Sequence, residues 1–242
     1  MAHCAGVSVP PILSDLADLV LGRCCLSCGT PAPGLCGPCL ARLRRPPMQL
    51  SRPQIAVPVL SAAAYSGLTR ELLIAYKEHG YRSLARPLGW MLADAIWTAR
   101  RLSSDRSVSI VRVPSHRRSQ RGYDALGDIA TVARRAISST GTPWQEQRLL
   151  RIGTDYPALK RLGKQARRDR IAGAFRLSGG VASGAPVILV DDIITTGATI
   201  AEAMRMLTAA GIRVSAIAVV AATASPDTSA TFHALAPARN PR

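Results

Sequence analysis

The segment from Val187 to Ile200 constrains the fold of this chain more than any other part of the sequence. It joins an apolar run, Val187–Val190, to the adjacent acids Asp191 and Asp192 and then to a Thr/Gly-rich loop. A continuous apolar run of this kind is typical of a strand buried on both faces of a parallel sheet. Because such sheets bind ligands at the carboxyl ends of their strands, we predict that the acids and the loop lie in a binding site.

Strand-like and helix-like patterns alternate along the rest of the chain, which predicts the α/β class. Predicted strands cover Val57–Tyr65, Val108–Val113 and Arg213–Ala222, and predicted helices cover Ser83–Arg101 and Thr199–Ala209. Two further helices are predicted from their apolar faces, one with Leu68, Leu72, Leu73 and Tyr76 and the other with Leu126, Ile129, Ala133 and Ile137. A proline-rich stretch at 44–58 predicts a linker. We therefore expect a cysteine-rich module at 1–45, the main domain at 55–224 and a flexible tail at 225–242.

The composition is that of a globular protein, with 48% hydrophobic and 19% charged residues. The net charge of +16 favours anionic partners, although a general bias toward arginine explains it equally well. Aromatic residues make up only 4%, which argues against binding single-stranded nucleic acid mainly by base stacking. No apolar stretch reaches the roughly 18 residues of a membrane span. With no basic leader at the start, we expect a cytoplasmic protein.

All six cysteines lie within the first 39 residues, and four of them form two Cys-x2-Cys pairs. The pairs are Cys25 with Cys28 and Cys36 with Cys39, a spacing typical of a tetrahedral thiolate site for Zn2+. Four thiolates leave no open coordination position, so this zinc is predicted to be structural, with Cys24 as an alternative to Cys25. Competing interpretations are unliganded thiols, disulfides, which a reducing compartment disfavours, and a redox dithiol, which would need a preceding strand.

The residues after the apolar run suit a sugar phosphate. Adjacent carboxylates at a strand end are costly to bury unless hydroxyl groups, a cation or water meet them, and two neighbouring sugar hydroxyls do so. The loop residues Thr195, Thr196, Gly197 and Thr199 offer hydroxyls and backbone amides at a helix N-terminus, which favours a phosphate. The combination predicts a ribose 5-phosphate ligand. The simpler alternative is a turn followed by a capped helix.

The complete pattern resembles the phosphoribosyl-pyrophosphate (PRPP) binding motif of type I phosphoribosyltransferases, two acids followed by Thr-Thr-Gly-x-Thr. From about Cys24 to Ala224 the chain is similar to the ComF/GntX family, which joins a short zinc ribbon to such a domain. Tyr65–Lys77 and Val113–Tyr123 contribute to this similarity. The resemblance implies a type I phosphoribosyltransferase-like parallel sheet flanked by helices, with a small N-terminal zinc-ribbon module.

The resemblance also implies that PRPP binds with Mg2+ and that a nucleophile displaces its pyrophosphate. Asp191 and Asp192 are then the expected catalytic residues, orienting the ribose hydroxyls, while the 195–199 loop holds the 5-phosphate. Basic side chains expected near the pyrophosphate, each with an alternative interpretation as solvated surface, are Lys77, Arg112, Arg117, Arg118 and Arg121. His116 is either a proton shuttle or polar surface. The sequence leaves the nucleophile, turnover and the oligomeric state open.

The segment from Arg148 to Arg176 carries nine basic residues against Asp155 and Asp169. In transferases of this type the corresponding region commonly forms a mobile cover over the active site, and a basic cover would complement a polyphosphate. Alternatively, it binds single-stranded DNA, a partner that the ComF resemblance also suggests because the family name comes from DNA uptake. The second hypothesis is therefore a competence accessory protein that binds nucleic acid and uses the domain as a scaffold.

Overall fold

The structure is a computed structural model, and it describes residues 24–32, 34–103, 108–114, 122–153, 173–178 and 184–224. Within these residues a six-stranded sheet has the order β1-β2-β8-β7-β3-β4. Its strands are β1 (Met48–Arg52), β2 (Ile55–Ala64), β3 (Ser109–Arg112), β4 (Gln145–Gln147), β7 (Val187–Ile194) and β8 (Val214–Ala222). All neighbours pair in parallel except β1 and β2, so the sheet is mostly parallel, as predicted.

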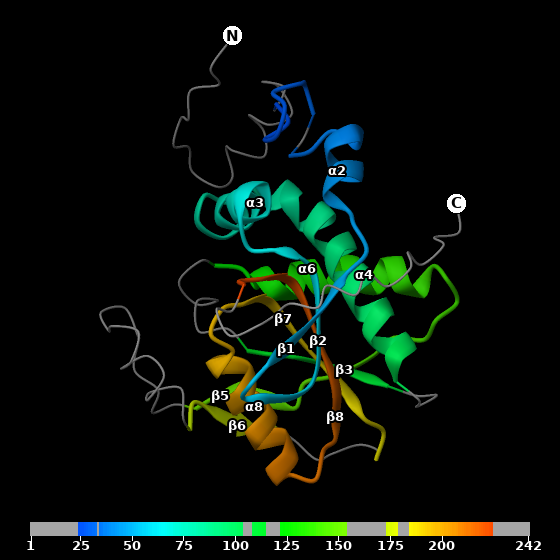
Figure 1. Ribbon diagram of the computed structural model, residues 1–242, viewed down its shortest axis with the longest axis vertical. Helices are drawn as coiled ribbons and strands as arrows, with labels where there is room; N and C mark the ends of the chain where they lie inside the picture. Colours follow the sequence, from blue (N-terminus) through cyan, green and yellow to red (C-terminus); the bar gives the residue numbers. More distant parts are fainter. Residues whose placement is uncertain are drawn as a thin grey trace.

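Helices cover both faces of the sheet (Figure 1). The covering helices are α3 (Gly67–Glu78), α4 (Ala85–Leu102), α6 (Ala125–Ser138) and α8 (Ala198–Ala209). A further helix, α2 (Gly37–Leu43), follows the cysteine segment, and a short 3-10 turn lies at Arg82–Leu84. Side chains from α3, α4 and α6 form one core with the sheet, and α8 forms the second core on the opposite face. The predicted strands and helices of the main domain are therefore confirmed, with ends that differ by a few residues.

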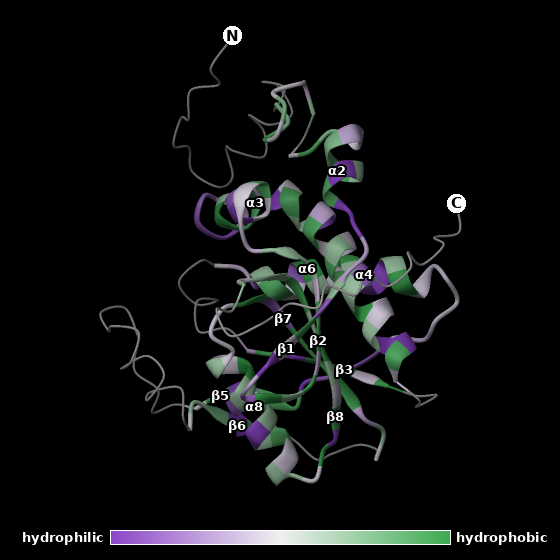
Figure 2. Ribbon diagram, in the orientation of Figure 1, coloured by the Kyte–Doolittle hydropathy of each residue, from purple (hydrophilic) through white to green (hydrophobic). Residues whose placement is uncertain are grey.

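The two central strands explain why the sequence folds this way. Every residue of Val187–Val190 is buried, and so are eight of the nine residues of β8. Alternate side chains of β7 enter different cores, with Ile188 and Val190 facing α4 and Leu189 facing α8. In Figure 2 the central strands are accordingly among the most hydrophobic parts of the chain. Helices on both faces are needed to bury these strands.

Residues 44–58, predicted to be a linker, contain β1 and the start of β2. The two strands pair antiparallel, with Met48 opposite Ser61 and Arg52 opposite Ile55. The prolines leave this pairing intact: Pro46 and Pro47 precede β1, Pro53 lies in the two-residue turn between the strands, and Pro58 lies in β2 just before its pairing with β8 begins at Val59. The linker prediction is wrong for this stretch, because prolines also occur before strands and in the turns between them.

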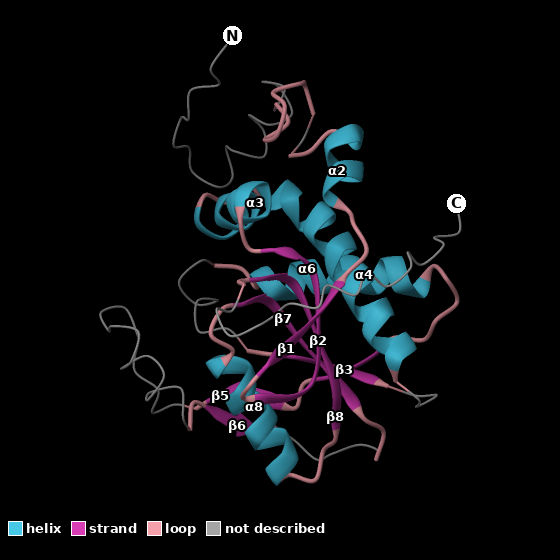
Figure 3. Cartoon of the chain, viewed as in Figure 1, coloured by secondary structure: helices cyan, strands magenta, loops and turns pink. Residues whose placement is uncertain are grey.

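A second, two-stranded sheet lies beside α8 (Figure 3). It pairs β5 (Leu150–Ile152) with β6 (Phe175–Leu177), and Leu150 and Phe175 are buried in the core that α8 forms. These strands bracket the middle of the predicted basic cover, whose residues 154–172 lie outside the described residues. The predicted tail at 225–242 also lies outside the described residues.

The cysteine segment and α2 lie at one end of the molecule, against α4 (Figure 1). Leu35 and Leu43 pack on the core formed by α3, α4 and α6. Arg44 forms a two-point ion pair with Asp94 of α4, with nitrogen–oxygen distances of 2.9 and 2.6 Å. Within the described part of the chain, none of the helices is both long enough and apolar enough for a membrane span.

Candidate functional site

The two predicted acids lie near the carboxyl end of β7, beside the helix that carries Lys77. Asp192 continues the series of β7 side chains that faces α3, and its Oδ2 is 2.5 Å from Lys77 Nζ. The Lys77 and Asp192 side chains are only 16% and 14% exposed, so this ion pair is shielded from water and salt. The structure thus brings Lys77 to the predicted site, where it binds an acid.

Asp191 has no such cation in direct contact within the described residues, and its own environment disfavours its charge. Burial, followed by the negative charge of Asp192, raises the pKa of Asp191 to about 8, while Lys77 and the Asp192 backbone N–H act in the opposite direction. That N–H donates to Asp191 Oδ1 at 2.8 Å. Near neutral pH Asp191 therefore holds a proton more readily than an ordinary aspartate, while Lys77 pairs with the neighbouring Asp192.

The loop after β7 presents backbone N–H groups at the start of α8. Gly197 adopts φ +82°, a left-handed conformation that glycine accepts readily, and a Cβ there would lie 3.0 Å from Gln54 Nε2. The Ala198 N–H donates to Thr196 Oγ1 at 3.4 Å. Among the described residues, no acceptor contacts the backbone N–H groups of Thr195, Thr196, Gly197 or Thr199. The loop can therefore donate several hydrogen bonds to an anion.

Some of the remaining predicted site residues lie within the described part of the chain and others lie outside it. Thr195 and Thr196 are exposed and Thr199 is partly exposed, so all three can reach a ligand. Arg117, Arg118, Arg121 and His116 lie outside the described residues.

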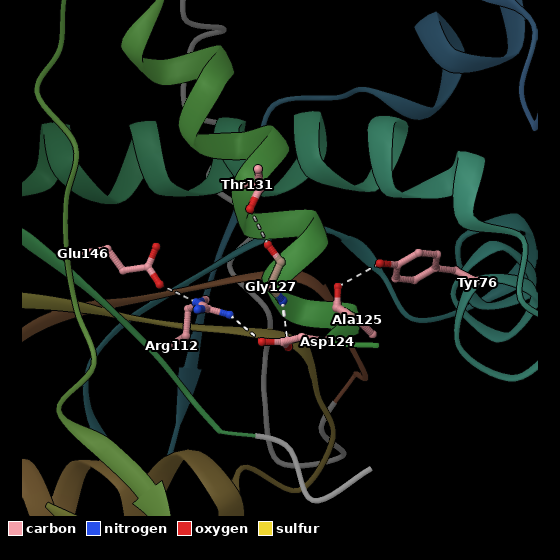
Figure 4. Close-up of polar contacts among 7 residues, drawn as sticks. All are labelled: Tyr76, Arg112, Asp124, Ala125, Gly127, Thr131 and Glu146. Atoms are coloured by element: carbon pink, nitrogen blue, oxygen red, sulfur yellow. Dashed lines mark hydrogen bonds and ion pairs between the residues drawn. The ribbon is translucent and has the colours of Figure 1, made fainter. Parts of the chain in front are cut away.

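Arg112 belongs to the fold rather than to an open anion site (Figure 4). Its Nε is 2.5 Å from Glu146 Oε1, and its Nη1 is 3.0 Å from Asp124 Oδ2. Asp124 also caps α6, because its Oδ1 accepts the Gly127 N–H at 3.0 Å. A Cβ on Gly127 would lie 2.6 Å from the Asp124 carboxylate and would displace it from the cap. With two carboxylates bound, Arg112 does not fit the pyrophosphate-binding role predicted for it.

Three residues behind the loop were not predicted as part of the site. Gln54 Nε2 donates to the Thr196 carbonyl, and Arg52 donates to the Thr223 carbonyl. Thr223 Oγ1 donates to the Thr195 carbonyl at 3.1 Å. Nothing in their local sequence marks these residues, because contacts across 171 positions for Arg52, 142 for Gln54 and 28 for Thr223 depend on the fold.

The second predicted site, the cysteine quartet, is assembled. The Sγ atoms of Cys25, Cys28, Cys36 and Cys39 all lie within 4.8 Å of one another, and those of Cys28 and Cys36 are 3.6 Å apart. A tetrahedron with Zn–S bonds of about 2.3 Å has edges of about 3.8 Å, so the spacing fits four thiolates on one ion. Cys24 is not in the cluster, which resolves the alternative in favour of Cys25.

The local backbone explains how the first pair approaches the cluster. The Gly29 N–H donates to the Cys25 carbonyl at 2.8 Å, which closes a tight turn around Cys28. Thr30 Oγ1 lies 2.6 Å from Cys28 Sγ, and this hydroxyl is the main reason that the pKa of the Cys28 thiol is lowered to about 6. A lowered pKa favours the thiolate, the form that binds metal.

Comparisons with known proteins agree with this architecture. The family model for uracil phosphoribosyltransferase matches residues 161–239, which include β7, the loop, α8 and β8. DNA utilization protein YhgH of Salmonella typhi is 29% identical to this chain over 190 residues, 76% of this chain and 77% of that protein. The protein of the same name from Salmonella typhimurium matches equally well.

The sheet order, the position of the acids and the family match point to the same conclusion, and they confirm the fold that the resemblance implied. The chain carries a phosphoribosyltransferase-type α/β domain, preceded by a four-cysteine cluster compatible with a zinc ribbon.

Proposed function

We propose that this chain binds PRPP, or another ribose 5-phosphate ligand, at the carboxyl end of β7 and acts as a Mg2+-assisted phosphoribosyltransferase. The observation that carries the proposal is the acid pair followed by a loop whose backbone N–H groups have no acceptor among the described residues. An acid pair can bind vicinal hydroxyls and a helix N-terminus can bind phosphate, so a single ribose 5-phosphate satisfies both.

Each residue would then act by orienting the ligand or by balancing charge. Asp191 and Asp192 would accept hydrogen bonds from the two ribose hydroxyls, with Lys77 holding Asp192 in place. The 195–199 loop would bind the 5-phosphate and so fix the anomeric carbon for attack. Bound Mg2+ would supply positive charge to the leaving pyrophosphate. The arginines at 117, 118 and 121 remain proposed contributors to the same charge balance.

Isothermal titration with PRPP and Mg2+ tests the proposal directly. Wild-type protein should bind, and a double variant, Asp191→Asn with Asp192→Asn, should bind at least about 10-fold more weakly, because a hydrogen bond to a charged carboxylate is lost and the acceptor at Asp191 is altered as well. Glu71→Gln, which removes an exposed acid from α3, is the control and should bind like the wild type. No measurable binding to the wild-type protein would contradict the proposal.

The raised pKa of Asp191 predicts that this acid lowers stability at alkaline pH. In the unfolded chain it ionises near its ordinary pKa of 3.8, but in the folded protein it does so only near pH 8. Between these values the folded state holds an extra proton, so stability falls as the pH rises. A loss of folding stability caused by one acid is expected where that acid is retained for a function at a binding site.

Asp191→Asn should therefore stabilise the protein more at pH 8.5 than at pH 5.5. We expect the melting-temperature difference between variant and wild type to widen by about 3 °C or more, the shift that roughly 1 kcal/mol produces in a chain of this size. Glu71→Gln is the control and should show no such widening. A constant difference across this pH range would mean that Asp191 ionises normally.

We also propose that the cysteine quartet holds one structural Zn2+. The Cys25 and Cys39 side chains are almost fully buried, and the segment has few other apolar side chains with which to form its own core. Binding of metal by four thiolates would supply the missing folding free energy.

Purified protein should contain about one zinc ion per chain by elemental analysis, as expected for a four-thiolate site. Cys36→Ser combined with Cys39→Ser should remove the metal and lower the melting temperature, because two ligands are lost. Cys24→Ser is the matched control and should keep the metal. Loss of zinc from the Cys24 variant, or retention in the double variant, would contradict the ligand set.

A second candidate function is binding of single-stranded DNA through the basic segment at 148–176. Two observations favour it: the name of the Salmonella relatives, and the position of Arg151 directly opposite Arg176 in the β5–β6 pair. Both side chains are exposed, so the two arginines place positive charge on this surface, where Glu202 lies near Arg176. The other basic residues of the segment, except Arg148, lie outside the described residues.

Fluorescence anisotropy with a labelled single-stranded oligonucleotide tests this function. Affinity should fall steeply with salt, because each phosphate contact releases counterions. Replacing Arg161, Arg167, Arg168 and Arg170 with glutamine should abolish binding, whereas the Asp191 and Asp192 double variant should retain it. Unchanged binding by the quadruple variant would remove this surface from consideration.

A further inference from the structure

The tip of the β1–β2 hairpin and Thr223, which follows β8, hold two carbonyl groups of the 195–197 loop. The Thr196 carbonyl accepts from Gln54 Nε2, and the Thr195 carbonyl accepts from Thr223 Oγ1. In a trans peptide the C=O and N–H groups point in opposite directions. Holding these two carbonyls on the hairpin side therefore turns the N–H groups of Thr196 and Gly197 to the other side of the loop.

The same two N–H groups have no acceptor among the described residues, so Gln54 and Thr223 fix their direction and leave them available to a ligand. Preorganised donors of this kind bind an anion more strongly than mobile ones, because the loop loses less conformational freedom on binding. Gln54 is exposed, and the contact with the Thr196 carbonyl is the one hydrogen bond of its side chain that the described structure records.

Arg52 adds a buried positive charge beside this loop. The residue is 6% exposed, and its guanidinium donates to the Thr223 carbonyl, next to the hydroxyl that holds Thr195. Its Nε–H is buried without a partner, and within the described residues no carboxylate forms an ion pair with it. A buried, unpaired cation is unfavourable on its own, and a bound anion nearby would offset that cost.

We propose that Arg52 and Gln54 are positioning residues for the phosphate-bearing end of a sugar phosphate on the 195–199 loop. Gln54, together with Thr223, orients the loop N–H groups, and Arg52 supplies positive charge from behind the loop. This inference rests on the proposed function, since it assumes that the loop binds a phosphate. It extends the site to a hairpin that no motif marks.

Titration with ribose 5-phosphate, and with PRPP and Mg2+, tests the role of Arg52. Arg52→Met should weaken both ligands by about 10-fold or more, the effect of losing an interaction with a charged group. The melting temperature without ligand should change little, because removal of an unpaired buried charge offsets the loss of the hydrogen bond to the Thr223 carbonyl. Arg52→Lys keeps the charge and should bind within about threefold of the wild type, because the proposed role is that of a positive charge. Arg101→Met, which removes an exposed charge at the far end of α4, should have no effect.

A second variant tests the loop orientation without disturbing a buried side chain. Gln54→Met keeps the size of the side chain but removes the donor, and it should weaken ribose 5-phosphate by about three- to tenfold. Its melting temperature without ligand should equal that of the wild type. Wild-type affinity in this variant would overturn the orienting role of Gln54.

The outcomes separate this inference from the proposed function. A wild-type protein that binds neither ligand would refute both. If the wild type binds but Arg52→Met binds equally well, only the role of Arg52 is overturned. If Arg52→Met and Arg52→Lys are equally weak and both melt at lower temperature, Arg52 serves only to hold the hairpin on Thr223, and the charge argument fails.

Discussion

The ion pair between Lys77 and Asp192 is the interaction on which the geometry of the site depends. Two adjacent carboxylates lie near the carboxyl end of β7, and both side chains are partly buried. Two ionised acids could not remain there together at low energy. Lys77 pairs with Asp192, whereas burial and the negative charge of Asp192 raise the pKa of Asp191. α3 must therefore pack with Lys77 over the end of β7, a position that the apolar face around Tyr76 secures in the core.

Most of the fold could be predicted from sequence because its main elements are long and strongly patterned. Val187–Val190 and the apolar face of α6 carry enough periodic residues to reveal their structure. β4, β5 and β6 each contain three residues, too few for alternation to be visible. β1 was missed for a different reason, since its neighbouring prolines predict irregular structure.

The candidate site likewise contains residues that the sequence predicts and residues that it does not. The acids and the threonine loop form one continuous segment, so their chemistry is visible in the sequence. Arg112 was misinterpreted because its two partners, Asp124 and Glu146, lie 12 and 34 positions away, and a lone arginine after a strand looks available for a ligand. Arg52 and Gln54 were missed because only the folded hairpin brings them to the loop. The sequence therefore indicates the ligand's chemistry better than it indicates the residues that support the site.

The attachment of the cysteine segment has a consequence for how the protein unfolds. Leu35 and Leu43 share a core with α4, and Arg44 is paired with Asp94 of the same helix. Detaching the segment would expose apolar surface on α4 and leave Asp94 without that partner. Detaching the cysteine segment thus has a cost that is felt in the core of the sheet domain.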